Sequence, residues 1–228
     1  TIADIALVDD EGVWLRARDA RIEWTPEKLF SGELEIQAVH VRLVDVLRMP
    51  RTTYESQRNP PPDIGLKLDE VVIEEVKLAD AIFKSEATYR ISGGLARPRD
   101  GSGYARLNLQ PLKGPGDIVD ATAEWTSEGA LSGKAMAVGP AGGLIASLIK
   151  PPEGKHVALS ANLDGTLTKF EADAKLLFND DTVASLDLSR NGDGANLRAM
   201  LDPGLWPMLA PLDQRAGGAL TLTGAASL

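Results

Sequence analysis

The sequence predicts an all-β fold in which mostly antiparallel strands form a curved, twisted sheet with a groove and a few short helices. Apolar and polar residues alternate along many stretches, for example Ala20–Trp24 and Val157–Leu163. Successive side chains of a strand face opposite sides of a sheet, so each stretch builds one apolar and one polar face. Turn residues such as Asp164-Gly165 and Asn191–Gly194 separate the stretches, which predicts antiparallel pairing between sequence neighbours.

A hairpin is expected at the beginning of the chain. Ile5 and Leu7 begin its first strand, and Trp14–Arg18 begins the return strand. Between them, Asp9–Gly12 supplies aspartates for local hydrogen bonds and a glycine for a tight reversal. The alternation of Ala20–Trp24 continues the β pattern.

A helix of one to two turns is predicted over Thr25–Gly32, which has a Thr cap, a Pro at the first helical position, an early Glu and a terminal Gly. Leu34 and Ile36 resume strand spacing. The denser apolar run Val39–Leu47 predicts a strand, or a pair of strands, with apolar neighbours on both faces. Residues 49–63 contain four prolines and are expected to form a long loop or linker.

Strands at short intervals are predicted over the rest of the chain. Alternation restarts at Ile64, and a strand over Ala87–Ile91 is expected to end at the Gly93-Gly94 break. Two short helices are expected, Ala141–Leu148 and Pro203–Leu209. Sets of strands separated by short helices indicate a repeat whose sequences have diverged. Further strands are expected near 102–110, 117–125, 130–138, 156–165, 168–178, 182–190, 194–201 and 217–227.

Composition excludes several classes of function. The net charge is −9, and no run of basic residues interleaved with aromatics is present, so nucleic acid is not an expected partner. The absence of cysteine excludes disulfides, thiolate zinc sites and cysteine nucleophiles. No apolar stretch is as long as the roughly 18 residues of a membrane span. Both ends have strand-like sequence without a signal-peptide pattern, and we expect residues 1–228 to be one continuous repetitive β-groove module cut from a longer protein.

No motif predicts catalysis, a metal ion or a cofactor. His40 and His156 each stand alone, without further ligands at zinc-motif spacing. Gly129–Lys134 has three residues between its glycines, whereas a phosphate-binding loop has four and a Ser or Thr after the lysine. Asp100–Gly103 and Asn191–Gly194 lack the distal Glu of a calcium loop, and are better explained as hairpin turns. A hydrolase would need residues that converge from distant segments.

The apolar positions allow two interpretations. They fill the core of a closed sandwich or barrel, or they line an open groove for acyl chains. Both surfaces need the same residues, because lipid tails and protein cores are both hydrocarbon.

Five segments of the chain resemble the N-terminal half of the TamB family, the inner-membrane component of the translocation and assembly module. These segments are Ile5–Leu15, Ala20–Ile36, Val44–Pro50, Leu66–Ile73 and Gly142–Leu148. The similarity spans most of the chain, and after about residue 180 only the period and the glycine turns continue it.

The resemblance implies a long periplasmic β-groove, related to AsmA-like and bridge-like lipid transfer proteins. It also implies an inner-membrane anchor and an outer-membrane partner of the Omp85 barrel class, reached through a C-terminal region; both lie outside this segment. Such a module moves phospholipid and supports outer-membrane protein assembly and secretion.

The predicted function is therefore passive and non-catalytic. Acyl chains would lie along the apolar face with head groups in water, since each buried CH2 contributes about 0.8 kcal/mol and a buried unpaired charge costs several. The main alternative is a scaffold that binds outer-membrane protein strands by edge addition. The predicted lipid-binding residues all belong to the apolar set of their strands: Ile22, Trp24, Leu34, Ile36, Leu66, Leu68, Ile73, Leu107, Leu109, Trp125, Leu159, Leu163, Leu176, Phe178, Leu186, Leu188, Leu197, Leu220 and Leu222.

Overall fold

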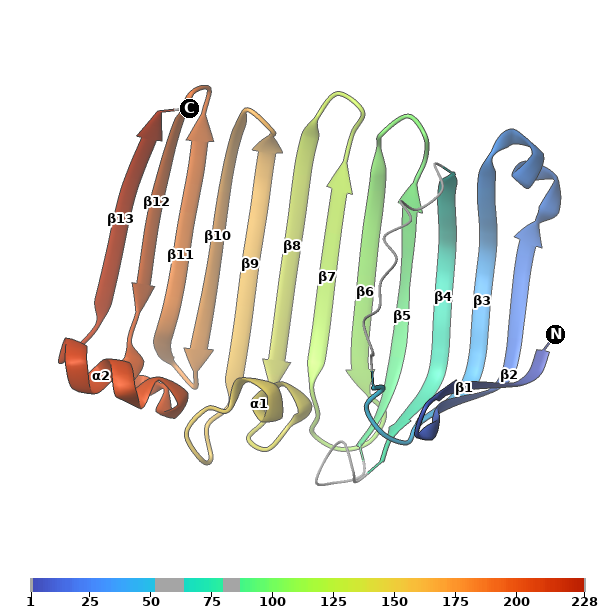
Figure 1. Cartoon of the computed structure of the whole chain (residues 1–228), viewed down its shortest axis with the longest axis horizontal. Helices are drawn as coiled ribbons and strands as arrows, with labels where there is room; N and C mark the ends of the chain where they lie inside the picture. Colours follow the sequence, from blue (N-terminus) through green and yellow to red (C-terminus); the bar gives the residue numbers. More distant parts are fainter. Residues whose placement is uncertain (1, 52–63, 80–86, 228) are drawn as a thin grey trace. The chain divides into compact units, whose positions relative to one another are not determined.

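The computed structural model describes residues 2–51, 64–79 and 87–227 and confirms the all-β prediction (Figure 1). Strands contain 65% of the residues and helices 12%. The strands form a curved, unclosed sheet, and the helices are few and short. The chain divides into two compact units, residues 1–114 and 115–228, which are described one at a time. A single continuous module over 1–228 stays a prediction.

Unit 1 is an open sheet whose strands pair in chain order. The 3-10 helix η1 (Pro26–Ser31) joins the second strand to the third, where the sequence predicts a short helix, and ends at Gly32 with φ 78°. The strands are β1 (Ile2–Asp9), β2 (Gly12–Thr25), β3 (Glu33–Val46), β4 (Gly65–Leu78), β5 (Ala87–Arg97) and β6 (Gly103–Pro111).

The pairing of β3 with β4 is parallel, whereas the other described pairs of unit 1 are antiparallel. Parallel neighbours need a long crossover connection, because the chain must return to the same end of the sheet. The segment between β3 and β4 includes the predicted linker 49–63. Most of that linker, residues 52–63, lies outside the described residues.

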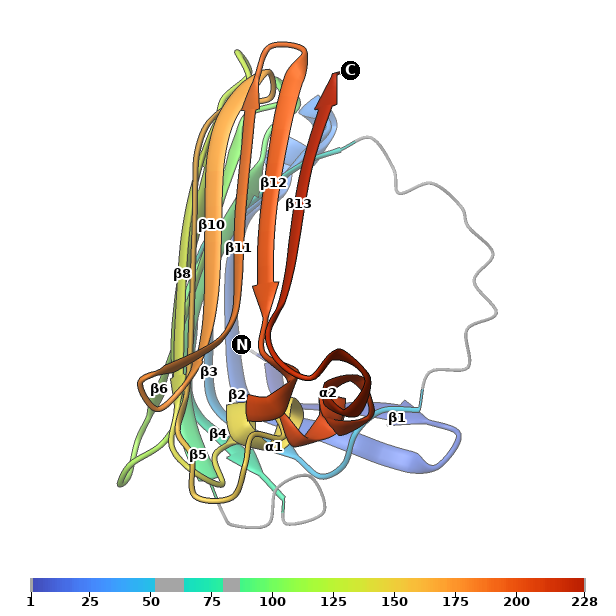
Figure 2. The ribbon, with the colours of Figure 1, turned by 90° about the vertical axis from the view of Figure 1, so that its left-hand side faces the viewer.

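A sharp bend crosses unit 1 within its strands. Asp19 of β2 has φ 54°, and the register between β4 and β5 shifts between Ile73 and Val76. Such irregularities bend a strand and increase its local twist. Figure 2 shows β1 and the adjoining end of β2 turned away from the long direction of the strands. The bend brings Ala17 and Ala20, three residues apart, into one buried cluster.

The expected break at Gly93-Gly94 is wrong, because β5 continues through both glycines to Arg97. A Cβ atom at Gly94 would lie 2.6 Å from the carbonyl oxygen of Asp69 on β4, and one at Gly93 would overlap the carbonyl oxygen of Arg106 on β6. The two glycines therefore permit close approach of neighbouring backbones inside the sheet.

Unit 2 contains seven strands that pair antiparallel in chain order. Each lies within a few residues of its predicted position. The strands are β7 (Ile118–Trp125), β8 (Ala130–Gly139), β9 (Val157–Thr166), β10 (Lys169–Phe178), β11 (Asp181–Asn191), β12 (Gly194–Leu201) and β13 (Leu220–Ser227).

Short helices lie between strands of unit 2 at the two predicted places. The helix α1 (Leu144–Ile149) begins three residues later than expected, after Gly142 with φ 73°. The predicted helix over 203–209 consists of two 3-10 turns, η2 (Pro203–Leu205) and η3 (Pro207–Leu209), and continues into α2 (Ala210–Ala216).

Candidate functional site

One face of the unit 2 sheet is apolar across all seven strands. The register aligns Ala137 and Leu176 with Leu159 in the middle strands. Farther along the sheet, Leu186 lies opposite Ala199. Following this register within the strands, the residues of this face are Ala, Gly, Val, Leu, Phe or Trp, apart from two charged ones, Arg190 and, opposite Phe178 beside the β10–β11 turn, Asp181. We call this surface the unit 2 apolar face.

The opposite face of the same strands is polar. On β9 it carries Ser160, Asn162 and Asp164, and on β10 it carries Glu171 and Asp173. Asn162 donates from its amide nitrogen to both carboxylate oxygens of Asp173, at 3.2 and 3.1 Å. This face also exposes Ile118, Met136 and Val138 at its β7–β8 side, but a continuous hydrocarbon surface across the strands is present on the apolar face alone.

The unit 2 apolar face is partly exposed over much of its extent. Leu186 exposes 40% of its surface, and Leu222 exposes 61%. The residues Leu159, Leu163, Leu188 and Leu197 are neither buried nor fully exposed. Contiguous apolar surfaces of this kind are uncommon on soluble proteins, and they mark binding sites.

A hollow of about 350 Å³ lies on this face. Alanines contribute most of its floor, and larger aliphatic side chains stand around them. Since an alanine side chain ends at Cβ, a row of alanines across neighbouring strands leaves a trough between the leucines. The lining includes Val119, Ala135, Ala137, Leu159, Ala161, Ala174, Leu176, Ala184 and Leu186.

One end of the unit 2 apolar face is closed. Ile145 and Ala146 of α1 pack with Val157, Phe178 and the remaining members of a buried cluster. Trp206 covers Phe178 with an edge-to-face contact, at 5.9 Å between ring centroids and an interplanar angle of 86°. Figure 2 shows α1 and α2 beside the same face of these strands, at one end. We call this the covered end.

The buried carboxylate of Asp117 holds α1 in place at the covered end. Asp117 is fully buried, and its oxygens accept hydrogen bonds from the backbone N–H groups of Leu144 at 2.7 Å and Ile145 at 2.8 Å. These donors have no partner within the helix. Gly143 is required beside them, because a Cβ there would lie 2.9 Å from Oδ1 of Asp117.

Unit 1 also has an apolar face. Trp24, Ile36 and Leu68 lie opposite one another on β2, β3 and β4. Trp24 exposes 46% of its surface and Leu107 also 46%. Near the bend this face is closed by the buried cluster that contains Ala17 and Ala20, against which Ile5 of β1 packs.

The register places the predicted lipid-binding residues on these two faces, nine in unit 1 and ten in unit 2. Phe178 and Leu176 differ from the others in exposure, at 1% and 7%. Phe178 belongs to the covered end, where a ligand on the open face does not reach it. Binding of lipid by the others stays a prediction.

Sequence reasoning missed the alanines of the trough and the cover supplied by Trp206. The alanines carry a signal, because Ala135 and Ala137, like Ala172 and Ala174, are spaced two apart in strand segments. Trp206 has no comparable signal, since it reaches Phe178 from a segment 28 residues later in a different element.

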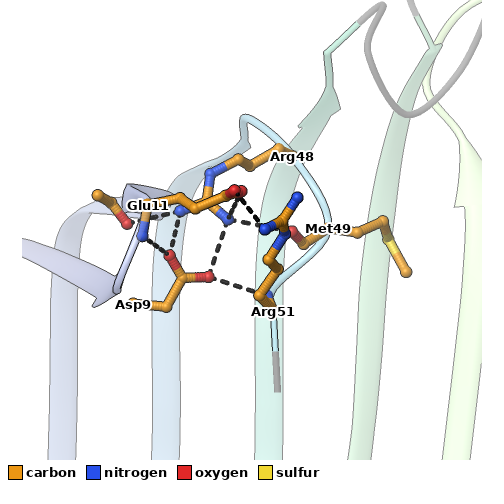
Figure 3. A network of polar contacts seen from close by, with 6 residues as sticks. Asp9, Glu11, Arg48, Met49 and Arg51 are labelled. Carbon is orange, nitrogen blue, oxygen red and sulfur yellow. Dashed lines mark hydrogen bonds and ion pairs between the residues drawn. The ribbon is translucent and has the colours of Figure 1, made fainter. Parts of the chain in front are cut away.

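A charged network pins the β1–β2 turn to the end of β3 (Figure 3). The Arg48 guanidinium donates to both carboxylate oxygens of Asp9 and, at 2.8 Å, to the carbonyl of Gly12. The backbone N–H of Arg51 donates to Asp9 at 2.9 Å, and the Arg51 side chain pairs with Glu11 at 2.8 Å. The pKa of Asp9 lies well below its usual range, and the main cause is the hydrogen bond from Arg48.

The geometry of this network favours a structural role, because its charged groups pair with one another around the β1–β2 turn. Over residues 2–51, 64–79 and 87–227, no group of three or more His, Cys, Asp or Glu side chains is arranged to hold a metal ion. Nor do any helices in those ranges have the length and apolar character needed to cross a membrane.

Comparisons with family models, curated proteins and solved structures found no match for this chain. Membership of the TamB family therefore stays a prediction from the sequence resemblance.

Proposed function

We propose that this chain is a non-catalytic, periplasmic, bridge-like module that carries phospholipid acyl chains along its apolar faces between inner and outer membrane. The observation that carries the proposal is the unit 2 apolar face, on which Leu186 and Leu222 remain exposed and which contains an alanine-floored hollow of about 350 Å³. An exposed hydrocarbon surface of this kind favours a hydrocarbon ligand.

The chemistry of the two faces suits an amphiphile. Acyl chains gain about 0.8 kcal/mol for each CH2 removed from water, and they need no directed polar partner. The phosphate head group would remain in water at the open side, because a charge buried without partners costs several kcal/mol. Its two charged residues, Arg190 and Asp181, lie at opposite ends of β11, so the face offers no set of groups for acid–base or nucleophilic chemistry.

Location and partners in this proposal rest on the sequence resemblance. The longer protein would be anchored in the inner membrane, and its C-terminal region would meet an outer-membrane barrel of the Omp85 class. In that setting the module would support outer-membrane biogenesis and protein assembly.

The test places charge on the open part of the unit 2 apolar face, away from the covered end. Leu188 and Leu197 are cross-strand partners there, and they are replaced together by aspartate. The matched control replaces Ser189 and Asn196, also cross-strand partners, which lie one residue along on the polar face.

Binding is measured as uptake of a pyrene-labelled phospholipid from phosphatidylethanolamine and phosphatidylglycerol vesicles. Wild type and the Ser189→Asp/Asn196→Asp control should take up the probe equally, and Leu188→Asp/Leu197→Asp should lose at least tenfold while keeping the wild-type circular dichroism spectrum. Absence of uptake by wild type, or equal uptake by a folded Leu188→Asp/Leu197→Asp variant, would contradict the proposal.

A scaffold that binds outer-membrane protein strands is the second candidate. It is favoured by β13, an exposed outer strand that pairs, within the described residues, with β12 alone. Binding of isolated β-strand peptides, unaffected by the Leu188→Asp/Leu197→Asp variant, would support this candidate in place of lipid carriage.

A further inference from the structure

Within the strands that the structure describes, Arg190 is the only cation on the unit 2 apolar face, and it lies near the end of β11 that is away from the covered end. Its cross-strand partners are Phe170 on β10 and Ala195 on β12. The Arg190 side chain is neither buried nor fully exposed. Because a charged group loses hydration beside an apolar surface, this position favours an anionic partner for the guanidinium.

The guanidinium of Arg190 is oriented by one hydrogen bond and has further donors for a ligand. Its Nε donates to the carbonyl oxygen of Gly192 at 3.1 Å, in the turn between β11 and β12. The remaining N–H donors of a guanidinium lie in one plane, and this arrangement matches the oxygens of a phosphate. Within residues 2–51, 64–79 and 87–227, no carboxylate, including that of Asp193 in the same turn, forms an ion pair with Arg190.

The carboxylates of the neighbouring strand segments lie on the other face of the sheet. Glu171 and Asp173 of β10, and Asp187 of β11, belong to the polar face. On the apolar face the other charge of β11 is Asp181, at the opposite end of the strand. The distribution of charge therefore favours an anionic group on the apolar side of the sheet, at the end where Arg190 lies.

We propose that Arg190 binds the phosphate of a phospholipid whose acyl chains lie along β11 toward the covered end. This inference rests on the proposed function and names the residue that fixes the head group. The stem of Arg190 would pack on the apolar face while its guanidinium meets the phosphate at the margin of that face. Because the phosphate is common to phospholipid head groups, Arg190 would select phospholipids over neutral lipids.

The length of β11 suits a lipid held in this way. Ala184 lies six residues before Arg190, which is about 20 Å along the strand. One acyl chain spans half of a bilayer core, or about 15 Å. Ala184 and Leu186 line the alanine-floored hollow. A phosphate at Arg190 would therefore place the ends of the acyl chains in the hollow, next to the covered end.

The test compares two probes with the same pyrene-labelled acyl chains, phosphatidylglycerol and diacylglycerol, which differ in the phosphate head group. Each probe is delivered from cyclodextrin, so that no unlabelled lipid competes for the apolar face. Wild type should bind phosphatidylglycerol about tenfold more tightly than diacylglycerol, because only the first probe can accept hydrogen bonds from Arg190 at a charged group.

Three variants assign that preference to Arg190. Arg190→Gln should lower the affinity for phosphatidylglycerol about tenfold and leave the affinity for diacylglycerol unchanged. Arg190→Lys, which keeps the charge but loses the planar donors, should give an affinity between those of wild type and Arg190→Gln. The matched control Arg198→Gln removes an exposed arginine from the polar face of β12 and should bind both probes as wild type does. Unchanged diacylglycerol binding and circular dichroism spectra verify folding.

The outcomes separate this inference from the proposed function. Failure of wild type to bind either probe would overturn both. Equal affinity of wild type for the two probes, or unchanged phosphatidylglycerol affinity in folded Arg190→Gln, would overturn this inference alone. Calorimetric titration with inorganic phosphate distinguishes the source of the anion: wild type should not bind it, and binding that is lost in Arg190→Gln would assign the site to free phosphate in place of a lipid head group.

Discussion

Truncation of Phe178 to alanine distinguishes a closed cluster from an open lipid-binding surface. The sequence groups Phe178 with Leu186 as lining residues, but Phe178 is 1% exposed and Leu186 is 40% exposed. If the covered end is closed, Phe178 contributes to the stability of the protein itself, since its ring packs against Trp206 and α1.

The expected cost follows from burial. Replacement of a fully buried Phe by Ala costs about 3–5 kcal/mol, which includes the lost edge-to-face contact with Trp206. Full burial of a leucine side chain stabilises a protein by about 1.5–3 kcal/mol. Because Leu186 is 40% exposed, it contributes roughly 60% of that free energy, so Leu186→Ala should cost about 1–2 kcal/mol. Phe178→Ala should therefore be the more destabilising by at least about 1 kcal/mol.

Urea unfolding followed by far-ultraviolet circular dichroism measures both changes. With an m value of about 2 kcal/mol/M, Phe178→Ala should lower the midpoint by about 1.5–2.5 M and Leu186→Ala by about 0.5–1 M. Equal midpoints for the two variants, at unchanged m values, would refute the closed covered end and return Phe178 to the open surface.

Three aspartates give further predictions. Because Arg48 lowers the pKa of Asp9, their interaction stabilises the fold above about pH 4 and is lost as the pH falls toward the lowered pKa. The difference in unfolding free energy between wild type and Asp9→Asn should therefore be largest at neutral pH and shrink below pH ~4. Asp117→Ala should cost about 3 kcal/mol, since one buried and one partly buried N–H group of α1 lose their acceptor, and hydrogen exchange at Leu144 should accelerate. At Asp19, whose φ is 54°, glycine should be tolerated within about 1 kcal/mol, whereas Asp19→Val should cost about 2 kcal/mol.

Each of these has a contradicting result. A wild-type minus Asp9→Asn difference that is constant from pH 7 to pH 2 would show that the Asp9 carboxylate is not stabilised by its partners. Unchanged exchange at Leu144 in Asp117→Ala would mean that another group caps α1. Equal stability of Asp19→Gly and Asp19→Val would mean that the bend does not depend on the positive φ of that residue.

The sequence alone predicts most strands of this protein, and it predicts which side chains share a face. Strand period and turn chemistry act between residues only a few positions apart, so the hairpin at Asn191–Gly194 is visible without knowledge of distant contacts. The turn expected at Asp164-Gly165 is wrong, because both residues lie inside β9 and the turn to β10 follows at residues 167–168. For the same reason, Leu159, Leu163 and the other predicted lining residues fall on a common face once the strands pair in order.

Only the tertiary structure decides what lies against that face. The parallel pairing of β3 with β4 and the closure of Phe178 by Trp206 both depend on segments far apart in the chain. Alternation has the same form in a buried strand and in a half-exposed strand, because both need hydrocarbon on one side. The sequence therefore determines the faces, and packing of distant elements determines that Phe178 is covered while Leu186 and Leu222 remain exposed.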